Sequence, residues 1–88
     1  MKENTKLPEI IIVDDHESYR GVLKTFIEAE KLGRIVGEAS DGHELIQLLT
    51  SKRPDLVLLD IDMPGLNGIM TTIKAKKIIL VGESKVLL

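Results

Sequence analysis

The sequence predicts an α/β fold, in which an open parallel sheet carries helices on both faces. Two apolar runs, Ile10–Val13 and Leu56–Leu59, each end abruptly in aspartate, which is typical of strands buried on both faces. Segments with helical spacing separate the candidate strands, so strand and helix alternate along the chain. Because crossovers between successive parallel strands are right-handed, this alternation predicts helices on both faces of one sheet. With 88 residues, the chain has room for a single domain, 1–88.

The first crossover is predicted to be a helix that follows Ile10–Val13. Its charged residues Arg20, Lys24 and Glu28 lie on one side, and Gly33 supplies a stop. The apolar residues at helical spacing on the other side are Tyr19, Val22, Leu23, Phe26 and Ile27.

A second strand and a second helix follow. Ile35 and Val36 open the strand, and Asp41 with Glu44 three residues later forms a capping box for the helix. The helix ends before Pro54. Its apolar residues are Leu45, Ile46, Leu48 and Leu49.

After Leu56–Leu59, the turn residues of 64–68 precede a short helix, Ile69 to about Lys76, and a fourth strand, Ile78–Val81. Those turn residues are Pro64, Gly65, Asn67 and Gly68.

Composition argues against several classes of protein. A net charge of −2 gives no field that would attract a polyanion or an anionic membrane, and the lack of cysteine rules out disulfides and thiolate metal sites. One Phe, one Tyr and no Trp leave no aromatic platform for single-stranded nucleic acid. No apolar run approaches the roughly 18 residues of a membrane span. We therefore expect a cytoplasmic protein with no direct contact to nucleic acid or membrane.

Three acids follow the predicted strands directly: Asp14 and Asp15 after the first and Asp60 after the third. The carboxyl ends of parallel strands share one edge of the sheet, where such folds place their chemistry. Three carboxylates there repel one another unless a cation is present, and hard oxygen ligands suit Mg²⁺. A lone acid would more simply cap a helix, but the pair and the single acid together, followed by Pro64 and Gly68, favour a site.

Three segments resemble the receiver domains of response regulators from two-component systems: IIIVDDHESYRGVLKTFIEA, GEASDGHELIQLL and RPDLVLLDIDMPGLNGI. The resemblance covers about residues 8–69 and leaves 70–88 as a divergent tail. It implies a flavodoxin-like three-layer fold with strand order 2-1-3-4-5. Since the chain stops soon after the fourth strand, we expect a truncated sheet of order 2-1-3-4 that lacks the family's last strand and helices.

The resemblance also implies roles for individual residues. Asp60 matches the phosphoacceptor, which takes a phosphoryl group from a sensor histidine kinase or phosphotransfer protein. Asp15 matches the direct ligand of Mg²⁺, Asp14 the acid that acts through water, and Asp62 the residue whose backbone carbonyl completes the metal site. His16, which follows the acid pair, is expected to be a loop or helix-start residue. The chain is not expected to be an enzyme in its own right.

Two departures from the family leave an alternative open. Gly82 stands where the family has Ser or Thr, and no lysine of a fifth parallel strand is present. The alternative is a non-catalytic receiver remnant that acts as a self-associating interaction module. A phosphatase of the haloacid dehalogenase type, suggested by LLDIDMP, is disfavoured by Pro64 and by the absence of its downstream motifs. Because Ile78–Val81 would be a bare apolar edge, we expect a homodimer or domain-swapped assembly.

Overall fold

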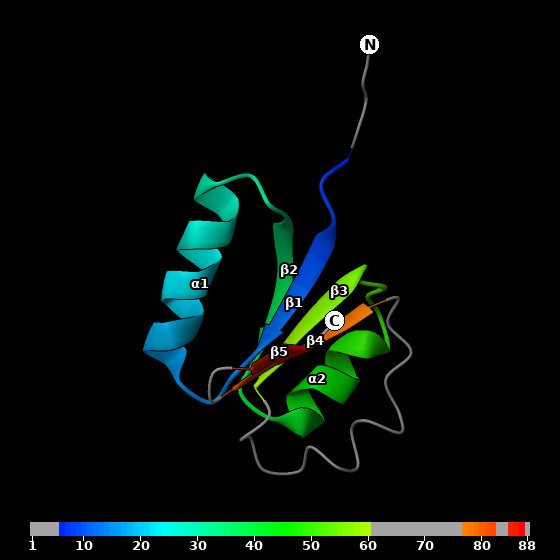
Figure 1. The fold of residues 1–88 in the computed structure, drawn as a ribbon. Coiled ribbons are helices and arrows are strands. Elements are labelled where there is room, and N and C mark those ends of the chain that lie inside the picture. Colours follow the sequence, from blue (N-terminus) through cyan, green and yellow to red (C-terminus); the bar gives the residue numbers. More distant parts are fainter. Residues whose placement is uncertain (1–5, 61–76, 83–84, 88) are drawn as a thin grey trace.

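A five-stranded sheet with the order β2-β1-β3-β4-β5 forms the centre of the protein (Figure 1). This computed structural model describes residues 6–60, 77–82 and 85–87. Strands β1 to β4 run parallel to one another, which confirms the predicted α/β fold and the order 2-1-3-4. The elements are β1 (Glu9–Val13), α1 (Glu17–Ala29), β2 (Arg34–Ala39), α2 (Gly42–Leu49), β3 (Leu56–Asp60), β4 (Lys77–Gly82) and β5 (Lys85–Leu87).

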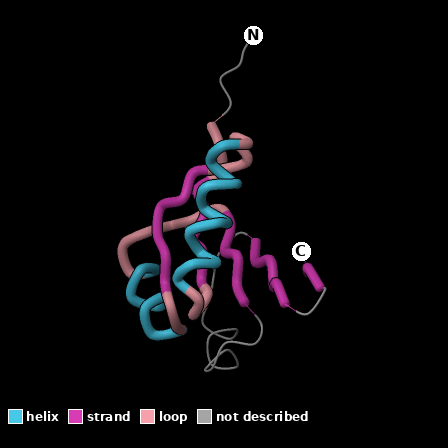
Figure 2. Tube along the Cα trace, turned by 90° about the vertical axis from the view of Figure 1, so that its left-hand side faces the viewer, coloured by secondary structure: helices cyan, strands magenta, loops and turns pink. Residues whose placement is uncertain are grey.

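The far edge of the sheet differs from the expectation. β5 pairs antiparallel with β4, with Leu80 opposite Leu87 and Gly82 opposite Lys85, so the edge predicted to be bare at Ile78–Val81 is paired over its second half, at Leu80 and Val81. β5 lies beside β4 close to the C-terminus (Figure 2). Three residues are too short a run to carry a strand signal of their own. The turn predicted at 64–68 and the short helix predicted at 69–76 lie outside the described residues.

The two faces of the sheet form separate halves of the core, because successive side chains of a strand point to opposite faces. α1 and α2 lie on opposite sides of the sheet (Figure 1). The face under α2 buries Ile11, Val13, Ala39, Leu45, Val57 and Leu59. The face under α1 buries Ile10, Ile12 and Ile27, with Leu23, Ile35, Leu56 and Leu58 packed against them. Both central strands therefore need apolar residues at every position, which explains the continuous runs in the sequence.

The buried side of α1 differs from the prediction. Leu23 and Ile27 pack on the sheet, but Tyr19, Val22 and Phe26 are 43%, 66% and 56% exposed. Arg20, predicted on the outer side, has a side chain that is only 14% exposed. Burial of a charge is tolerated where it is paired and hydrogen-bonded, and the partners of Arg20 are described below.

The end of α1 is set by Lys31 and not by Gly33. Lys31 has a φ of 56°, in the left-handed region, and its N–H donates to the carbonyl of Glu28 at 3.2 Å. The next N–H, of Leu32, donates to Ile27 at 2.9 Å, which completes a Schellman motif. Gly33 has a different role, since a Cβ there would lie 2.3 Å from the Ile10 side chain. The glycine therefore allows the chain to pass close to β1.

The predicted cap of α2 at Asp41 is confirmed, whereas the returning bond of the capping box goes to Ser40 instead of Asp41. The N–H of Glu44 donates to Asp41 Oδ1 at 2.9 Å, and the Glu44 carboxylate accepts from the backbone N–H of Ser40 at 2.7 Å. The helix ends at Leu49, before Pro54, as predicted. The box fixes where the chain turns from β2 into α2.

Candidate functional site

The parallel register of β1 and β3 brings the predicted acids to the same edge of the sheet. Val13 pairs with Leu59, so the residues that follow, Asp14 and Asp60, emerge side by side. One ligand atom from each of Asp14, Asp15, His16 and Asp60 lies within 4.8 Å of the others. We call these four residues the acid–histidine cluster. It contains three of the four residues predicted for the metal site, whereas Asp62 lies outside the described residues.

Asp14 is the most firmly held member of the cluster. It is 5% exposed, and its backbone N–H donates to the carbonyl of Ala39 in β2 at 3.0 Å. Its Oδ1 accepts from the backbone N–H of His16 at 2.8 Å and lies 3.1 Å from the ring Nδ1 of the same histidine. Both the backbone and the carboxylate of Asp14 are therefore held by hydrogen bonds at the carboxyl edge of the sheet.

Asp15 and Asp60 present their carboxylates differently. Asp15 is exposed, and its Oδ1 lies 3.0 Å from His16 Nδ1. Asp60 is half-buried at the end of β3, where its backbone is paired with Val81 of β4. The site thus combines one buried, one half-buried and one exposed carboxylate, and is open to solvent on the side of Asp15.

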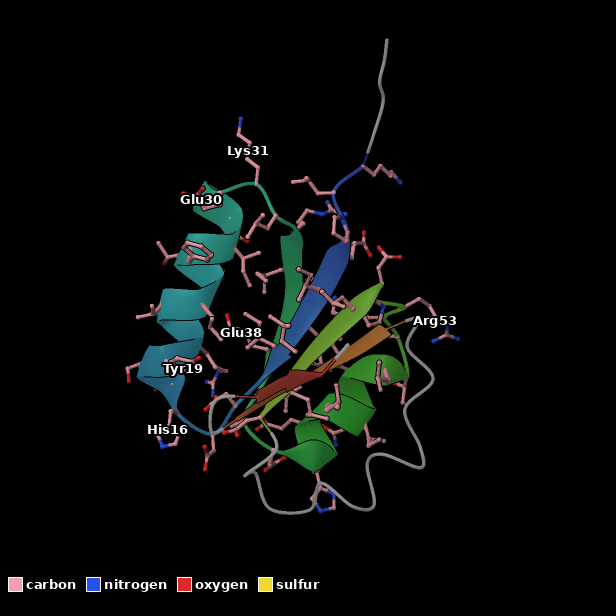
Figure 3. The ribbon with its side chains drawn as sticks, viewed as in Figure 1. His16, Tyr19, Glu30, Lys31, Glu38 and Arg53 are labelled. Carbon is pink, nitrogen blue, oxygen red and sulfur yellow. The ribbon has the colours of Figure 1, made fainter. Side chains whose placement is uncertain are left out.

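Arg20 holds the loop that carries Asp14 and Asp15. Its Nη1 donates to the carbonyl of Asp14 at 2.5 Å, and its Nε donates to Glu38 of β2 at 3.3 Å. Lys24 lies 3.5 Å from the other Glu38 oxygen. Figure 3 shows Glu38 between α1 and the sheet, and His16 at the start of α1. Arg20 therefore links the backbone of the site to both α1 and β2.

The cluster is strongly acidic, as its effect on His16 shows. The hydrogen bond to Asp14, followed by the negative charge of Asp15, raises the pKa of the His16 imidazole. Adjacent carboxylates favour any nearby cation. Carboxylate oxygens in a solvent-accessible site are also the ligands that Mg²⁺ takes alongside its retained waters, so the residues present fit that ion.

Sequence reasoning missed two contributors to the site. His16 is a helix-start residue as expected, the N-cap of α1, but the sequence did not show that its ring points into the cluster. Arg20 was assigned to the outer side of α1, because periodicity cannot distinguish a solvated charge from one that is paired against the backbone.

Two further residues reach the same edge of the sheet through their backbones. Gly82 follows Val81, the β4 partner of Asp60, and therefore stands at the carboxyl end of β4 as predicted. Lys85 opens β5 opposite Gly82. The antiparallel direction of β5 thus brings a lysine backbone to the edge where the family has the lysine of a parallel fifth strand.

A cavity of about 630 Å³ opens at the other end of the sheet. It is lined by Lys6, Leu7, Glu9, Arg34, Arg53 and Asp55, which come from the starts of β1, β2 and β3 and their neighbours. Glu9 and Arg34, two of its lining residues, form an ion pair. The cavity shares no residue with the acid–histidine cluster.

Comparison with known proteins identifies the family. The sequence profile of the response regulator receiver domain matches residues 10–84. The chain belongs to the response regulator receiver domain family. The receiver is 40% identical over 80 residues to the nitrate/nitrite response regulator protein NarL of Escherichia coli K12, covering 91% of this chain and 37% of NarL. It is 41% identical over 63 residues to the transcriptional regulatory protein LiaR of Bacillus subtilis, covering 72% of this chain and 30% of LiaR.

Solved structures share the receiver fold. CheY6 in complex with the P1 domain of CheA3, from R. sphaeroides, is among the chains that match at a TM-score of 0.77 and 27% identity, with 89% of this chain and 65% of the other covered. The signal receiver domain of a NarL response regulator from Mycobacterium tuberculosis matches at a TM-score of 0.76 and 23% identity, with 92% and 70% covered. The likeness to the second of these concerns the fold alone.

The receiver spans about a third of the length of the curated relatives NarL and LiaR. A protein-glutamate methylesterase/protein-glutamine glutaminase from Pyrococcus horikoshii is also 41% identical, over 61 residues that make up 17% of its length. Similar receiver segments therefore occur in proteins whose remaining parts differ. Among the described residues, neither helix has the length and apolar character needed to cross a membrane.

Proposed function

We propose that this receiver is a phosphoacceptor module, in which Asp60 takes a phosphoryl group from a phosphohistidine of a sensor histidine kinase or phosphotransfer protein in the cytoplasm. The observation that carries the proposal is the convergence of Asp14, Asp15 and Asp60, from two strands, to within 4.8 Å. Membership of the receiver family supports it, as does the complex of the similar CheY6 chain with the P1 domain of CheA3.

Asp60 has the role of nucleophile. One of its carboxylate oxygens attacks the phosphorus atom, a P–O bond forms, and the P–N bond to the partner's imidazole breaks, leaving the electron pair on the imidazole nitrogen. β3 is paired with β1 as far as Leu59 and with β4 as far as Asp60, which positions the backbone that carries that carboxylate. Because little covalent chemistry is demanded of the protein, positioning is its main contribution.

Asp14, Asp15, Asp60 and the backbone carbonyl of Asp62 are the groups proposed to hold Mg²⁺. When bound, Mg²⁺ neutralises charge on the phosphoryl oxygens and on the acids that surround them. Asp14 is fixed by Ala39, His16 and Arg20, so its carboxylate needs no reordering when a cation enters. Arg20 is a positioning residue, because its bond to Asp14 goes to the backbone carbonyl and not to the carboxylate proposed to hold the ion.

The test is intact-mass measurement after incubation with Mg²⁺ and a small acyl phosphate. The parent chain is expected to gain the mass of one phosphoryl group, and the Asp60→Asn variant none, since the amide keeps the shape but is no nucleophile. Asp41→Asn is the matched control, because asparagine caps a helix as well as aspartate does. Modification of Asp60→Asn to the same extent as the parent would contradict the assignment.

A second candidate function is favoured by Gly82. The carboxyl end of β4 is where the family carries a hydroxyl side chain, and glycine has none. A receiver without that hydroxyl could act as an interaction module that is not phosphorylated. In that case the folded parent gains no mass under the same conditions, while its circular dichroism spectrum stays that of an α/β protein.

Self-association is proposed with either function, and we assign it to α1 because β5 already pairs with β4 at Leu80, Val81 and Gly82. Tyr19, Val22 and Phe26 lie on one exposed stripe of the helix, and the exposed residues that border it on one side, at Ser18, Thr25 and Ala29, are uncharged. Each aromatic side chain buries about 150–250 Å² in a full contact, so two such stripes bury several hundred Å², less than the roughly 1,200 Å² of a stable interface. We propose a weak homodimer with α1 packed on α1 of a second copy.

Light scattering across a dilution series tests this interface. The parent is expected to dissociate on dilution, and Val22→Lys to remain monomeric at all concentrations. Thr25→Lys, at the border of the stripe, is expected to have a smaller effect. A parent that is monomeric at millimolar concentration would rule the interface out.

A further inference from the structure

We infer that His16 supplies a nitrogen ligand to the cation site, so that binding of a first-row transition-metal dication depends on His16 whereas binding of Mg²⁺ does not. The inference rests on the proposed cation site of Asp14, Asp15 and Asp60. It adds a residue that the phosphoacceptor role does not use, and it assigns the chemical class of ion that this residue selects.

The distances between the side-chain atoms carry the first step. His16 Nδ1 lies 3.1 Å from Asp14 Oδ1 and 3.0 Å from Asp15 Oδ1. Adjacent ligands of an octahedral ion that are about 2.1 Å from the metal are about 3.0 Å from each other. The imidazole nitrogen therefore stands at the spacing from both carboxylates that neighbouring ligands of one ion have.

Asp60 is compatible with the same ion. Its carboxylate lies within 4.8 Å of the other three ligand atoms. Ligands on opposite sides of an octahedral ion are about 4.2 Å apart. The 4.8 Å limit therefore allows the Asp60 oxygen to lie either adjacent to or opposite each of the other ligand atoms. One nitrogen and three oxygens can thus surround a single cation without rearrangement of the backbone.

The conformation of His16 carries the second step. His16 is the N-cap residue of α1, with an extended backbone at φ −99° and ψ 104°, but within the described part of the chain its side chain makes no capping hydrogen bond. Ser, Thr, Asp and Asn at an N-cap turn a side-chain oxygen toward the free N–H groups of the first helical turn, a role that the His16 ring does not take. Here the ring turns away from the helix and toward the carboxylates.

Solvent access carries the third step. The His16 side chain is 72% exposed and that of Asp15 is 48% exposed, so an ion can reach the nitrogen from solution. The backbone N–H of His16 donates to Asp14 Oδ1 at 2.8 Å, and this bond does not depend on the side chain. A substitution at His16 can therefore remove the nitrogen ligand and leave the aspartates in place.

The ligand set determines which cation benefits. Imidazole nitrogen suits Co²⁺, Ni²⁺, Cu²⁺ and Zn²⁺, whereas Mg²⁺ takes oxygen ligands and keeps several waters. A nitrogen donor added to three carboxylates raises affinity for the first group and leaves Mg²⁺ little changed. His16 would then set the selectivity of the site.

Isothermal titration with Co²⁺ and with Mg²⁺ tests the inference in the parent and in two variants. His16→Asn replaces the nitrogen with an amide and keeps a residue that favours the N-cap position. His43→Asn, at an exposed position in the first turn of α2, is the matched control and the only other histidine in the chain. In His16→Asn we expect the Kd for Co²⁺ to rise by about tenfold or more and that for Mg²⁺ to change by less than about threefold.

Proton NMR of the Co²⁺-loaded proteins reports the bond itself. A strongly shifted, exchangeable ring N–H signal is expected in the parent and in His43→Asn and is expected to be absent from His16→Asn. Persistence of that signal in His16→Asn, or an unchanged Kd for Co²⁺, would overturn the inference while leaving the Mg²⁺ site intact. If the parent bound neither ion, the proposed cation site would fail together with the role of His16.

Discussion

Replacing Arg20 with methionine is expected to destabilise the receiver by about 2–4 kcal/mol. Methionine keeps most of the apolar length of the side chain, so packing changes little, but it removes two interactions. Hydrogen bonds to charged groups contribute about 1.5–3 kcal/mol, which applies to the 2.5 Å contact with the carbonyl of Asp14. The partly exposed ion pair with Glu38, at 3.3 Å, adds about 0.2–1 kcal/mol.

Lys24→Met provides the matched control for this prediction. Lys24 shares the Glu38 partner, at 3.5 Å, but its side chain is 45% exposed and lies one turn further along α1 than that of Arg20. Its loss should cost no more than about 0.5 kcal/mol. The difference between the two variants therefore isolates the bond to the Asp14 backbone.

Urea unfolding followed by circular dichroism measures both variants. In a Glu38→Gln background, where the ion pair is already weakened, Arg20→Met should still cost about 1.5 kcal/mol or more, because the Asp14 bond remains to be lost. The same variant should bind Mg²⁺ more weakly than the parent, while Lys24→Met should not. Equal destabilisation by Arg20→Met and Lys24→Met, or complete loss of the Arg20 effect in Glu38→Gln, would refute the reasoning.

Four further outcomes are expected. Mg²⁺ should raise the Tm of the parent by mass action and have a smaller effect on Asp15→Ala, and equal shifts in scanning calorimetry would count against Asp15 as a ligand. Asp41→Ala should lose about 1 kcal/mol in urea unfolding while Asp41→Asn stays near the parent, because only alanine removes the cap of α2. Lys31→Gly should gain roughly 0.5–1 kcal/mol by relieving the left-handed φ of 56°, whereas Lys31→Ala should gain nothing. In metal-free protein the pKa of His16 is raised, so its charged form stabilises the fold below the unfolded-state pKa, and this stabilisation is lost as pH rises through the folded-state pKa. NMR titration of the His16 ring should therefore show a lower pKa in Asp14→Asn than in the parent.

The sheet and the position of the acids could be predicted from the sequence because each depends on short-range patterns. The apolar runs before Asp14 and Asp60 identify strands buried on both faces, and parallel pairing then brings their carboxyl ends together. The Asp41 capping box is likewise a local signal. These features need no knowledge of the rest of the chain.

The orientation of α1 could not be predicted in the same way. Its apolar residues cover more of the helix surface than the sheet can bury, so periodicity alone does not tell which of them face the core. Leu23 and Ile27 pack inward, while Val22 and Phe26 remain outside, because Arg20 occupies the inner side with its charge bonded to Asp14 and Glu38. Which side of α1 faces the sheet thus depends on the tertiary partners of Arg20, and the spacing of residues along the helix does not show these partners.

β5 was missed for a different reason. A segment of three residues, Lys85–Leu87, becomes a strand only because β4 offers it an edge. Antiparallel addition next to a parallel sheet also departs from the family pattern. Neither fact is visible in the local sequence.

The order of strands in the sheet has a consequence for biosynthesis. β1 is made first, but it lies between β2 and β3, which are made later. At about 5–20 residues per second, roughly 2–9 seconds separate the synthesis of Val13 from that of Leu56. During that interval the Ile10–Val13 run has no partner from β3, and short apolar β-forming segments of this kind aggregate readily. The strand that positions Asp14 therefore needs protection from other chains until β3 has been made.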